Sequence, residues 1–453
     1  MRARSRRRGL ILLAPAVAAV TVLGACSSNS NNHASPAPTL TGECAKYQAY
    51  SGHQGTKVTM FASIISPESD SLQKSWDEFS KCTGIKISYE GSNDFESQLP
   101  VRVTGGNAPD LAIIPQPGLL QKMVQTGKVA KPSAQTAANV DKYWNKTWKT
   151  YGSVKGTFYA APMSANMKSF VWYSPKAFQK AGYQVPKTWD DLMKLSDTIA
   201  KSGQGKPWCG GIGSGTATGW PATDWLEEVV LRTGGGDVYD KWVSHDLKFS
   251  SPEITDAMKQ LANWMQNPAW VNGGFGDVKS IATTTFQDAG KPILTGKCWM
   301  LQQASFYEAQ WPKGTKVAED GDVFAFYLPG INPSVKTPVE GGGEFVTAFS
   351  NRPEVQAVQT YLSTPEWATS RIKVAPGWVS ANQGVDKSVY TDPIDKLSAQ
   401  YLTDPDATFR FDASDLMPAA VGAGQEWKSM TAWFAQGQSI DQVAKDIDAA
   451  WPA

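Results

Sequence analysis

Short apolar runs alternate with stretches of helical periodicity from residue 57 onward. Residues 57–65, 85–89 and 111–114 are apolar or alternating runs of strand length, and the intervening segments 68–81 and 94–104 carry helical patterns. Strand, helix, strand, helix, strand is the order expected of a parallel sheet whose faces are covered by helices. The pattern therefore predicts an α/β fold.

The same alternation continues through the rest of the chain. Polar and Gly/Pro-rich connections separate the later segments, and we find no tandem repeat. Thr188 precedes one helical segment, where its hydroxyl is expected to cap the helix. Further strands are expected at 157–161, 170–173, 322–328 and 344–349, and further helices at 189–202, 224–233, 252–266 and 439–451.

The first residues have the pattern of an export signal. Five arginines among the first eight residues form a positive segment, and the apolar run 10–23 that follows is too short for a membrane span of about 20 residues. Leu23-Gly24-Ala25-Cys26 then resembles the lipobox of bacterial lipoproteins, in which the cysteine carries the lipid. We expect residues 1–25 to be a removed signal peptide and Cys26 to anchor the mature chain to the membrane.

Two alternatives stay open for this leader. An ordinary secretory signal can end in a coincidental cysteine, and Ser5-Arg6-Arg7 fits twin-arginine export as well as a general arginine-rich signal. Residues 26–43 are polar and interrupted by proline, which predicts a disordered tether. Removal of 25 of the 453 residues leaves 428, enough for two or three domain-sized units.

The mature chain has a nearly balanced charge. The leader contains five of the 43 basic residues and none of the 42 acidic ones, so 38 basic and 42 acidic residues remain, a net charge of −4. This balance gives no reason to expect nucleic acid as a partner.

Four cysteines remain after lipidation of Cys26, an even number in an oxidising compartment. Four cysteines allow three pairings. We predict the bridges Cys44–Cys82 and Cys209–Cys298, because each bridge then stays within one segment of the chain.

Signatures of enzymes are mostly missing from the sequence. Of the three histidines, His33 lies in the tether, His53 precedes the first strand, and only His245 stands in a Ser-His-Asp sequence. The Gly-rich run 210–219 lacks both GxGxxG and the GK[ST] ending of a P-loop, so we expect a tight loop that brings backbone close to a neighbouring element or ligand. The aspartates between 404 and 415 do not follow calcium-loop spacing. We expect no catalytic residue, cofactor or metal.

Aromatic residues are more informative, because the chain has 18 Trp against 17 Phe, with 14 Tyr besides. Several lie in loops beside hydroxyl, amide and carboxylate side chains, at 218–224, 302–306, 376–378 and 424–427. A sugar ring has a face of C–H bonds and a rim of hydroxyls, so its receptor needs flat aromatic surfaces and planar hydrogen-bonding groups. These loops favour a carbohydrate site.

Two segments carry a family resemblance. Residues 106–115 (GNAPDLAIIP) and 161–173 (APMSANMKSFVWY) resemble two segments of family 1 extracellular solute-binding proteins, the maltose-binding-protein-like receptors of ABC importers. The matching order extends over nearly the whole mature chain and includes the glycines 341–343 and the segment 415–418. Residues 208–225 are similar to the alpha-glucoside-binding branch.

This resemblance implies a two-lobed periplasmic-binding-protein fold, in which crossing strands join the lobes and the ligand lies in the cleft between them. We expect the N-terminal lobe to comprise 44–163 and 341–385, and the C-terminal lobe 164–340 and 386–453. No residue is expected to be catalytic.

The resemblance also implies the ligand-binding residues. Asn166 stands at the first crossing, where relatives often place a carboxylate, and its amide suggests a neutral ligand. Trp427 falls where the maltose-binding branch stacks a sugar ring. Pro117 and Gly118 stand where maltose receptors carry acidic and basic side chains, which argues against maltose itself. The remaining expected ligand-binding residues are Asn93, Asp94, Gln116, Thr218, Trp220, Asp224, Gln303, Ser305, Phe306, Glu344, Trp378 and Asp412.

Taken together, these features predict a monomeric, lipid-anchored receptor on the extracytoplasmic face of the bacterial membrane. We expect it to bind an oligosaccharide or glycoside, with a disaccharide favoured, and to deliver it to the permease of an ABC importer. Two alternatives remain. A secreted glycosidase would use two carboxylates some 5 to 10 Å apart, and a receptor for a solute such as glycerol phosphate would need a convergent Arg/Lys cluster.

Overall fold

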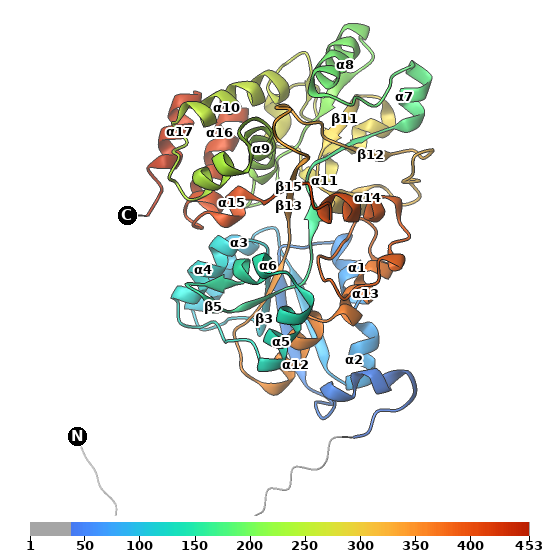
Figure 1. Cartoon of the computed structure of the whole chain (residues 1–453), viewed down its shortest axis with the longest axis vertical. Helices are drawn as coiled ribbons and strands as arrows, with labels where there is room; N and C mark the ends of the chain where they lie inside the picture. The colour runs from blue at the N-terminus through green and yellow to red at the C-terminus, as the bar shows by residue number, and fades with distance from the viewer. Residues whose placement is uncertain (1–37, 453) are drawn as a thin grey trace, which may run out of the picture. The chain divides into compact units, whose positions relative to one another are not determined.

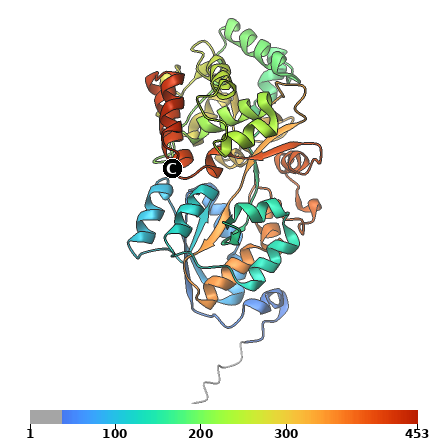
Figure 2. The same ribbon diagram turned by 60° about the vertical axis from the view of Figure 1, so that its left-hand side comes forward.

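Two five-stranded sheets, each flanked by helices, organise the described part of the chain (Figure 1). The structure is a computed structural model that describes residues 38–452. The expected signal peptide 1–25, the lipidation site Cys26 and most of the expected tether lie outside the described residues. Figure 2 shows the helices around both sheets from a second direction.

The first sheet forms what we call the N-lobe. Its strand order is β2-β1-β3-β14-β6; the first three strands are parallel, and β14 runs antiparallel to both β3 and β6. The strands are β1 (Lys57–Ala62), β2 (Lys86–Gly91), β3 (Leu111–Ile114), β6 (Ala160–Pro162) and β14 (Phe345–Ala348), beside a β4–β5 hairpin (Ser153–Val154 and Thr157–Phe158). The helices are η1 (Gly42–Tyr50), α1 (Glu68–Lys74), α2 (Asp77–Thr83), α3 (Phe95–Thr104), α4 (Pro117–Gln125), α5 (Ala134–Tyr143), α6 (Lys146–Tyr151), α12 (Pro353–Leu362) and α13 (Pro365–Val374).

The second sheet forms the C-lobe. Its order is β10-β9-β11-β8-β12, with β9, β10 and β11 parallel and β8 antiparallel to β11 and β12. The strands are β8 (Phe170–Tyr173), β9 (Lys206–Cys209), β10 (Val271–Asn272), β11 (Cys298–Gln302) and β12 (Phe324–Tyr327). The helices are α7 (Pro175–Ala181), α8 (Trp189–Ser202), α9 (Trp220–Val243), α10 (Pro252–Met265), η2 (Lys279–Ala282), α11 (Phe286–Ala289), η3 (Lys291–Thr295), η4 (Ser305–Gln310), η5 (Lys387–Val389), α14 (Pro393–Leu402), α15 (Ala413–Leu416), the π-helix η6 (Val421–Glu426), α16 (Trp427–Gln436) and α17 (Ile440–Asp448).

A small third sheet connects the lobes. It consists of β7 (Asn166–Met167), β13 (Pro338–Gly342) and β15 (Thr408–Phe411), in the order β15-β13-β7. The chain leaves the N-lobe through β7 and returns through β13, so the two lobes are joined by paired strands. Two separate hydrophobic cores result, one around each five-stranded sheet.

Most segments expected from periodicity are present. The strands 111–114 and 170–173 and the helix 189–202 have the expected bounds, and the Thr188 hydroxyl accepts the Asp191 N–H (3.1 Å) as a cap. The helix expected at 68–81 is instead two helices, because the backbone leaves helical geometry at Trp76, whose side chain is buried. The strand expected at 157–161 is likewise divided between β5 and β6.

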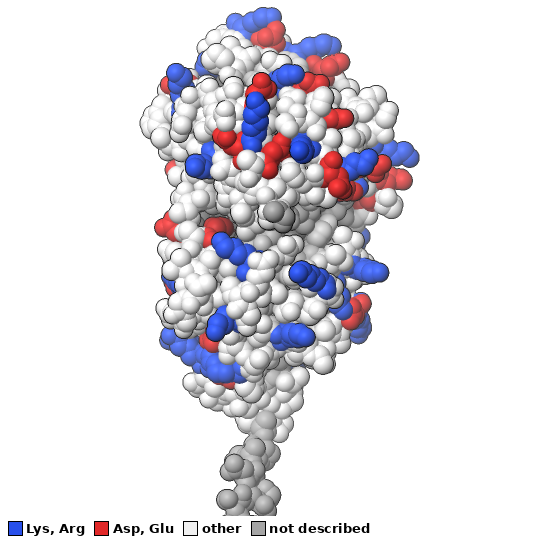
Figure 3. Space-filling view, turned by 90° about the vertical axis from the view of Figure 1, so that its left-hand side faces the viewer, with Lys and Arg blue, Asp and Glu red and all other residues white. Residues whose placement is uncertain are grey.

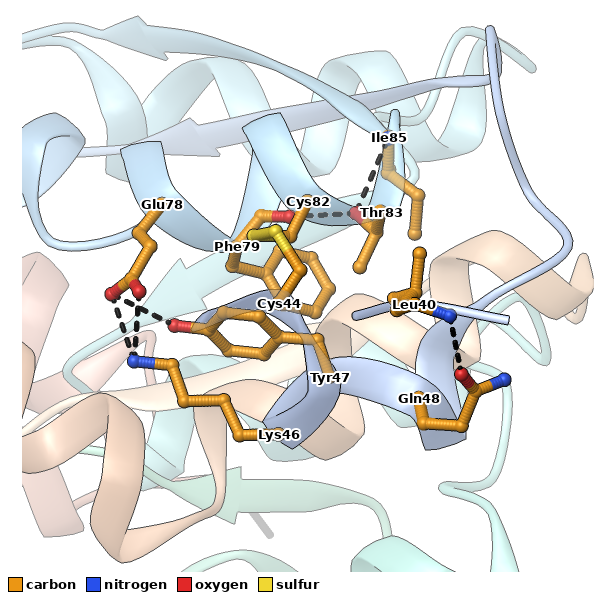
Figure 4. The surroundings of a disulfide bond; sticks show 10 residues. All are labelled: Leu40, Cys44, Lys46, Tyr47, Gln48, Glu78, Phe79, Cys82, Thr83 and Ile85. Carbon is orange, nitrogen blue, oxygen red and sulfur yellow. Dashed lines mark hydrogen bonds and ion pairs between the residues drawn. A yellow bond between two sulfur atoms is a disulfide. The ribbon is translucent and has the colours of Figure 1, made fainter. Parts of the chain in front are cut away.

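Both predicted disulfides are present, which confirms the pairing. Cys44–Cys82 joins η1 to α2 with a Cα–Cα distance of 5.2 Å, and Figure 4 shows Tyr47 and Phe79 beside it. Cys209–Cys298 joins the neighbouring strands β9 and β11 (Cα–Cα 5.4 Å). Helix η1 begins at Gly42, two residues inside the segment expected as tether.

The described surface carries charges of both signs. Figure 3 shows basic and acidic side chains scattered over one face, with uncharged residues between them. This distribution agrees with the nearly balanced charge of the chain. Among residues 38–452, no helix has the length and apolar character needed to cross a membrane.

Candidate functional site: a cleft between the lobes

A cavity lies between the two lobes, at the carboxyl ends of the first three strands of the N-lobe sheet. It encloses about 920 Å³, including space open to solvent, and residues of both lobes and of the crossing strands line it. Ligands of open α/β sheets bind outside the carboxyl ends of the strands. The cavity therefore has the position of a small-molecule site.

The N-lobe contributes polar groups from the turns after its strands. Residues 63–65 follow β1, Asn93 and Glu96 follow β2, and Gln116 follows β3. The Gln116 amide donates to Glu96 (Nε2 to Oε1, 3.2 Å), whereas Gln116 Oε1 and Glu96 Oε2 are buried without a hydrogen-bond partner within the described chain. Burial raises the pKa of Glu96 to about 7. This wall presents two oxygens that can accept hydrogen bonds from a ligand.

The C-lobe contributes an aromatic wall. Trp220 is the first residue of α9, Phe286 is the first residue of α11, and Phe306 lies in η4. The ring centroid of Trp220 lies 4.9 Å from that of Phe286 and 6.1 Å from that of Phe306. Three segments far apart in the sequence thus place their rings together on one side of the cavity.

Trp427 reaches the cavity from the start of α16. Its indole Nε1 donates to Ser414 Oγ (3.3 Å), which holds the ring in place. Gly219 packs against the Trp427 backbone so closely that a Cβ would lie 2.2 Å from the carbonyl oxygen, and its φ of 114° is one that glycine adopts readily. Glycine at this position therefore brings the starts of α9 and α16 together at the cavity.

Lys168 is the only basic residue among the described residues that line the cavity. Its Nζ lies 2.8 Å from Asp224 Oδ1 and also contacts Asp412. Burial alone would lower the pKa of Lys168, but the surrounding carboxylates, Asp224 and Asp412 first, raise it well above its usual value. The ammonium is therefore charged and already neutralised by protein carboxylates.

The crossing strands supply Asn166 and Glu344. Asn166 Oδ1 accepts the Gly342 N–H (3.1 Å), so its amide is held against β13. The Glu344 N–H donates to Ser164 Oγ (3.0 Å) on the other crossing segment. Burial first, and then the charge of Glu68, raise the pKa of the Glu344 carboxyl to about 8. Both residues line the cavity, Asn166 from β7 and Glu344 from the short link between β13 and β14.

The lobes touch at two places beside the cavity. A Cβ on Gly215 of the C-lobe would lie 2.7 Å from the Asn93 carbonyl oxygen, and the Thr216 hydroxyl donates to the same oxygen (3.4 Å). A Cβ on Gly118 at the start of α4 would lie 1.8 Å from the Met417 carbonyl oxygen. The first contact confirms that the Gly-rich run brings its backbone close to a neighbouring element.

Eight of the fourteen residues expected to bind ligand line the cavity, and each reaches it from a strand end, a helix start, η4 or a crossing strand. They are Asn93, Gln116, Asn166, Trp220, Phe306, Glu344, Asp412 and Trp427.

Three further expected residues lie behind the cavity wall. Asp224 is one helical turn deeper than Trp220 in α9 and is buried against Lys168. Ser305 accepts the Met167 N–H on its Oγ (3.3 Å), and the Gln303 side chain accepts the Ala304 N–H (2.7 Å). Asp224 thus contacts the lining residue Lys168, whereas Met167 and Ala304, the partners of Ser305 and Gln303, do not line the cavity.

The last three expected residues also do not line the cavity. The Thr218 hydroxyl forms hydrogen bonds within its own loop, with the Ser214 N–H (3.0 Å) and the Gly215 carbonyl (2.7 Å). Asp94 lies directly before α3, and its N–H donates to Ser92 Oγ (3.1 Å). Trp378 packs into the N-lobe core, with its ring centroid 5.4 Å from that of Trp367.

Several lining residues were not expected from the sequence. Lys168 and the glycines of β13 lie within the segments that carried the family resemblance, so they could have been found there. Phe286 and Gln287 follow a segment without a recognisable motif. The unexpected lining residues are Ser63, Ile64, Ile65, Glu68, Glu96, Pro115, Lys168, Ser214, Ala217, Phe286, Gln287, Gln310, Gly342, Gly343 and Asp415.

Comparison with known proteins identifies the family of the chain. The model of the family described as bacterial extracellular solute-binding protein matches residues 65–371. The chain is 35% identical to the alpha-glucosides-binding periplasmic protein AglE of Rhizobium meliloti over 88% of both chains. It is 33% identical to the osmoprotective compounds-binding protein GgtB of Synechocystis, covering 87% of this chain and 92% of that protein.

Solved structures share the fold. The bacterial solute receptor AcbH, described with an exclusive preference for β-D-galactopyranose, matches with a TM-score of 0.74 and 19% identity, covering 88% of this chain and 98% of that chain. This likeness confirms the two-lobed α/β architecture expected from the sequence.

Proposed function

Because the chain belongs to the family of bacterial extracellular solute-binding proteins, it is an extracytoplasmic binding protein and not an enzyme, and we propose that its ligand is a neutral sugar or glycoside of about disaccharide size. The protein would capture this ligand in the interlobe cleft and deliver it to the permease of an ABC importer. The names of its relatives support this class of ligand, since AglE is named for alpha-glucosides.

The combination of one aromatic wall and one polar wall carries the proposal. Trp220, Phe286 and Phe306 offer apolar ring surfaces to the C–H face of a sugar, while Gln116 and Glu96 offer oxygens to its hydroxyls. Each buried oxygen without a partner costs roughly 1–3 kcal/mol, which a ligand hydroxyl would recover.

The charge of the cleft supports a neutral ligand. Lys168 is matched by Asp224 and Asp412, so an anionic ligand such as glycerol phosphate would meet carboxylates and no free cation among the described lining residues. Such a ligand would need converging basic groups. Hydroxyl groups, in contrast, can donate to these carboxylates.

The attachment of the protein is part of the proposal. A lipid on Cys26 would hold the body at the extracytoplasmic face, and residues 26–43 would serve as its tether. We also propose that the protein is a monomer, with an N-terminal lobe of 44–163 and 341–385 and a C-terminal lobe of 164–340 and 386–453. The two separate hydrophobic cores support a division into two lobes, and Val389 and Tyr390, just beyond the last boundary, pack with the N-lobe core.

A ligand screen tests the proposal. The purified protein is heated with mono-, di- and trisaccharides, small neutral osmolytes and glycerol phosphate, and any ligand that raises the melting temperature is titrated by calorimetry. We expect a neutral glycoside to bind and glycerol phosphate to have no effect. The osmolytes are included because GgtB is named for osmoprotective compounds.

Two tryptophan variants locate the binding. Trp220→Ala should weaken it, whereas Trp451→Ala, which removes a tryptophan stacked on His245 away from the cavity, should not. A screen in which no sugar binds, or a sugar whose affinity is the same in both variants, would contradict the proposal.

A further inference from the structure

Three carboxylates meet where η4 packs against the start of α14. One oxygen each from Glu308, Asp392 and Asp395 lies within 4.8 Å of the others. Glu308 comes from η4, whereas Asp392 and Asp395 come from the first turn of α14, so two segments of the chain converge on one point. None of these three residues lines the interlobe cavity.

Two of the three side chains are buried and incompletely hydrogen-bonded. Glu308 is 7% exposed and Asp395 is 1% exposed. Glu308 Oε2 and Asp395 Oδ1 are both buried and have no hydrogen-bond partner within the described residues. A buried carboxylate oxygen without a donor is costly, and each of these two belongs to a side chain that points into the cluster.

The cluster has no basic residue bound to it. None of its carboxylates forms an ion pair among residues 38–452. Three carboxyl groups held this close together, two of them buried, repel one another unless a cation or a shared proton lies between them.

We propose that Glu308, Asp392 and Asp395 bind one calcium ion at the junction of η4 and α14. All three ligands are oxygens, which selects a hard cation. Calcium accepts about six to eight oxygens in irregular arrangements, whereas magnesium demands a near-ideal octahedron and keeps several of its waters, for which a site with two buried side chains leaves little room. The three residues come from two segments far apart in the sequence and match no calcium-loop spacing, so the site was not predicted.

The compartment supplies the ion. Extracytoplasmic proteins meet calcium at concentrations at which modules with dissociation constants of about 0.1–1 mM are occupied.

The ion would strengthen one wall of the cleft. Helix η4 also carries Phe306 and Gln310, both of which line the cavity. The loop before α14 already approaches η4, because a Cβ on Gly377 would lie 2.5 Å from the Ser305 carbonyl oxygen. Calcium would therefore tie the cleft-lining η4 to α14.

The test measures calcium binding directly. The purified protein is freed of metal with EDTA and dialysed at pH 7.5 against radioactive calcium, and its melting temperature is measured with calcium, magnesium or EDTA. We expect one calcium per chain, a rise of about 1–3 °C in melting temperature with millimolar calcium, and a smaller response to magnesium.

Amide variants locate the ion. Glu308→Gln and Asp395→Asn keep the shapes of the side chains and should weaken calcium binding at least about tenfold. Asp190→Asn, which removes an exposed carboxylate elsewhere in the C-lobe, should bind like the wild type. Asn is a good helix cap, so Asp392→Asn provides a third variant that keeps the start of α14.

A shared proton is the competing explanation of the cluster. In that case the wild type would bind no calcium at pH 7.5, and the two amide variants would change the melting temperature equally in calcium and in EDTA. Either result, or equal binding of calcium and magnesium, would overturn the proposal.

Discussion

Lys168→Met is expected to destabilise the protein strongly. The substitution keeps a long side chain but removes the charge that Asp224 and Asp412 share. Removal of one partner from a buried ion pair typically costs about 3–5 kcal/mol, because the other charge stays buried without compensation. The Lys168 side chain is 6% exposed, so solvent screens this charge little.

The surroundings decide where in that range the value falls. Glu340 on β13 is fully buried near Lys168, and neither of its carboxylate oxygens has a partner within the described chain, so the lost cation leaves additional repulsion. Burial raises the pKa of Asp224, and loss of the Lys168 charge would raise it further, so Asp224 can relieve part of the repulsion by taking up a proton. We therefore expect a loss near the lower limit, about 3 kcal/mol at neutral pH.

Urea unfolding followed by tryptophan fluorescence measures this loss. Lys176→Met is a matched control, because Lys176 forms an ion pair with Asp322 at the same 2.8 Å distance but its side chain is 59% exposed. Such an exposed pair contributes about 0–1 kcal/mol. The double variant Lys168→Met/Asp412→Asn should recover part of the loss. If Lys168→Met costs no more than Lys176→Met, Lys168 does not compensate the buried carboxylates.

Four further predictions follow from the site and the fold. Trp220→Ala should weaken sugar binding by about 1–3 kcal/mol in calorimetry, because it removes part of the aromatic wall. Replacing Cys209 and Cys298 by alanine should lower the unfolding free energy by roughly 4–5 kcal/mol on the chain-entropy model, measured in urea against the oxidised wild type, whereas the reduced wild type should unfold like the variant. Cys26→Ser should move the protein from the membrane to the soluble fraction and abolish acyl labelling. Glu96→Gln should stabilise the ligand-free protein more at pH 8 than at pH 5. Because the pKa of Glu96 is raised from 4.5 to about 7 in the folded protein, this residue favours folding below pH about 4.5, and its contribution is lost as pH rises through about 7. Melting curves of the variant and the wild type at both pH values measure the difference.

The fold followed largely from periodicity, and its exceptions have local causes. The strand 111–114 is short and apolar, and helix 189–202 has both an amphipathic pattern and a Thr cap, so the bounds of both could be predicted. Helix α4 was not predicted because it begins with Pro117 and Gly118, which read as a turn. Proline is favourable at the first position of a helix, and Gly118 is needed because Met417 lies against it.

The site was predictable where it depends on strand ends and not where it depends on the packing of the lobes. Asn93 and Gln116 directly follow strands, so their place at the sheet edge was foreseeable. Asp224 illustrates the limit, because it shares a helix face with Trp220 but lies one turn further from the cavity. Only the position of α9 relative to the crossing strands decides which of the two meets a ligand.

The same packing explains why the crossing region is rich in buried carboxylates. Lys168 and Glu340 lie on paired crossing segments, with the Lys168 N–H donating to the Glu340 carbonyl, so the lysine cannot leave its partners without disturbing the strands that join the lobes. A buried ion pair of this kind adds little net stability over a pair of apolar side chains. It nevertheless destabilises every conformation in which the two charged partners separate, because each charge then stays buried alone. The ion pairs of Lys168 with Asp224 and Asp412 therefore restrict how the strands can be arranged about the cleft. A sugar whose hydroxyl donates a hydrogen bond to Asp412 would contact the carboxylate that also pairs with Lys168. Sugar binding would therefore be coupled to the geometry of the crossing strands.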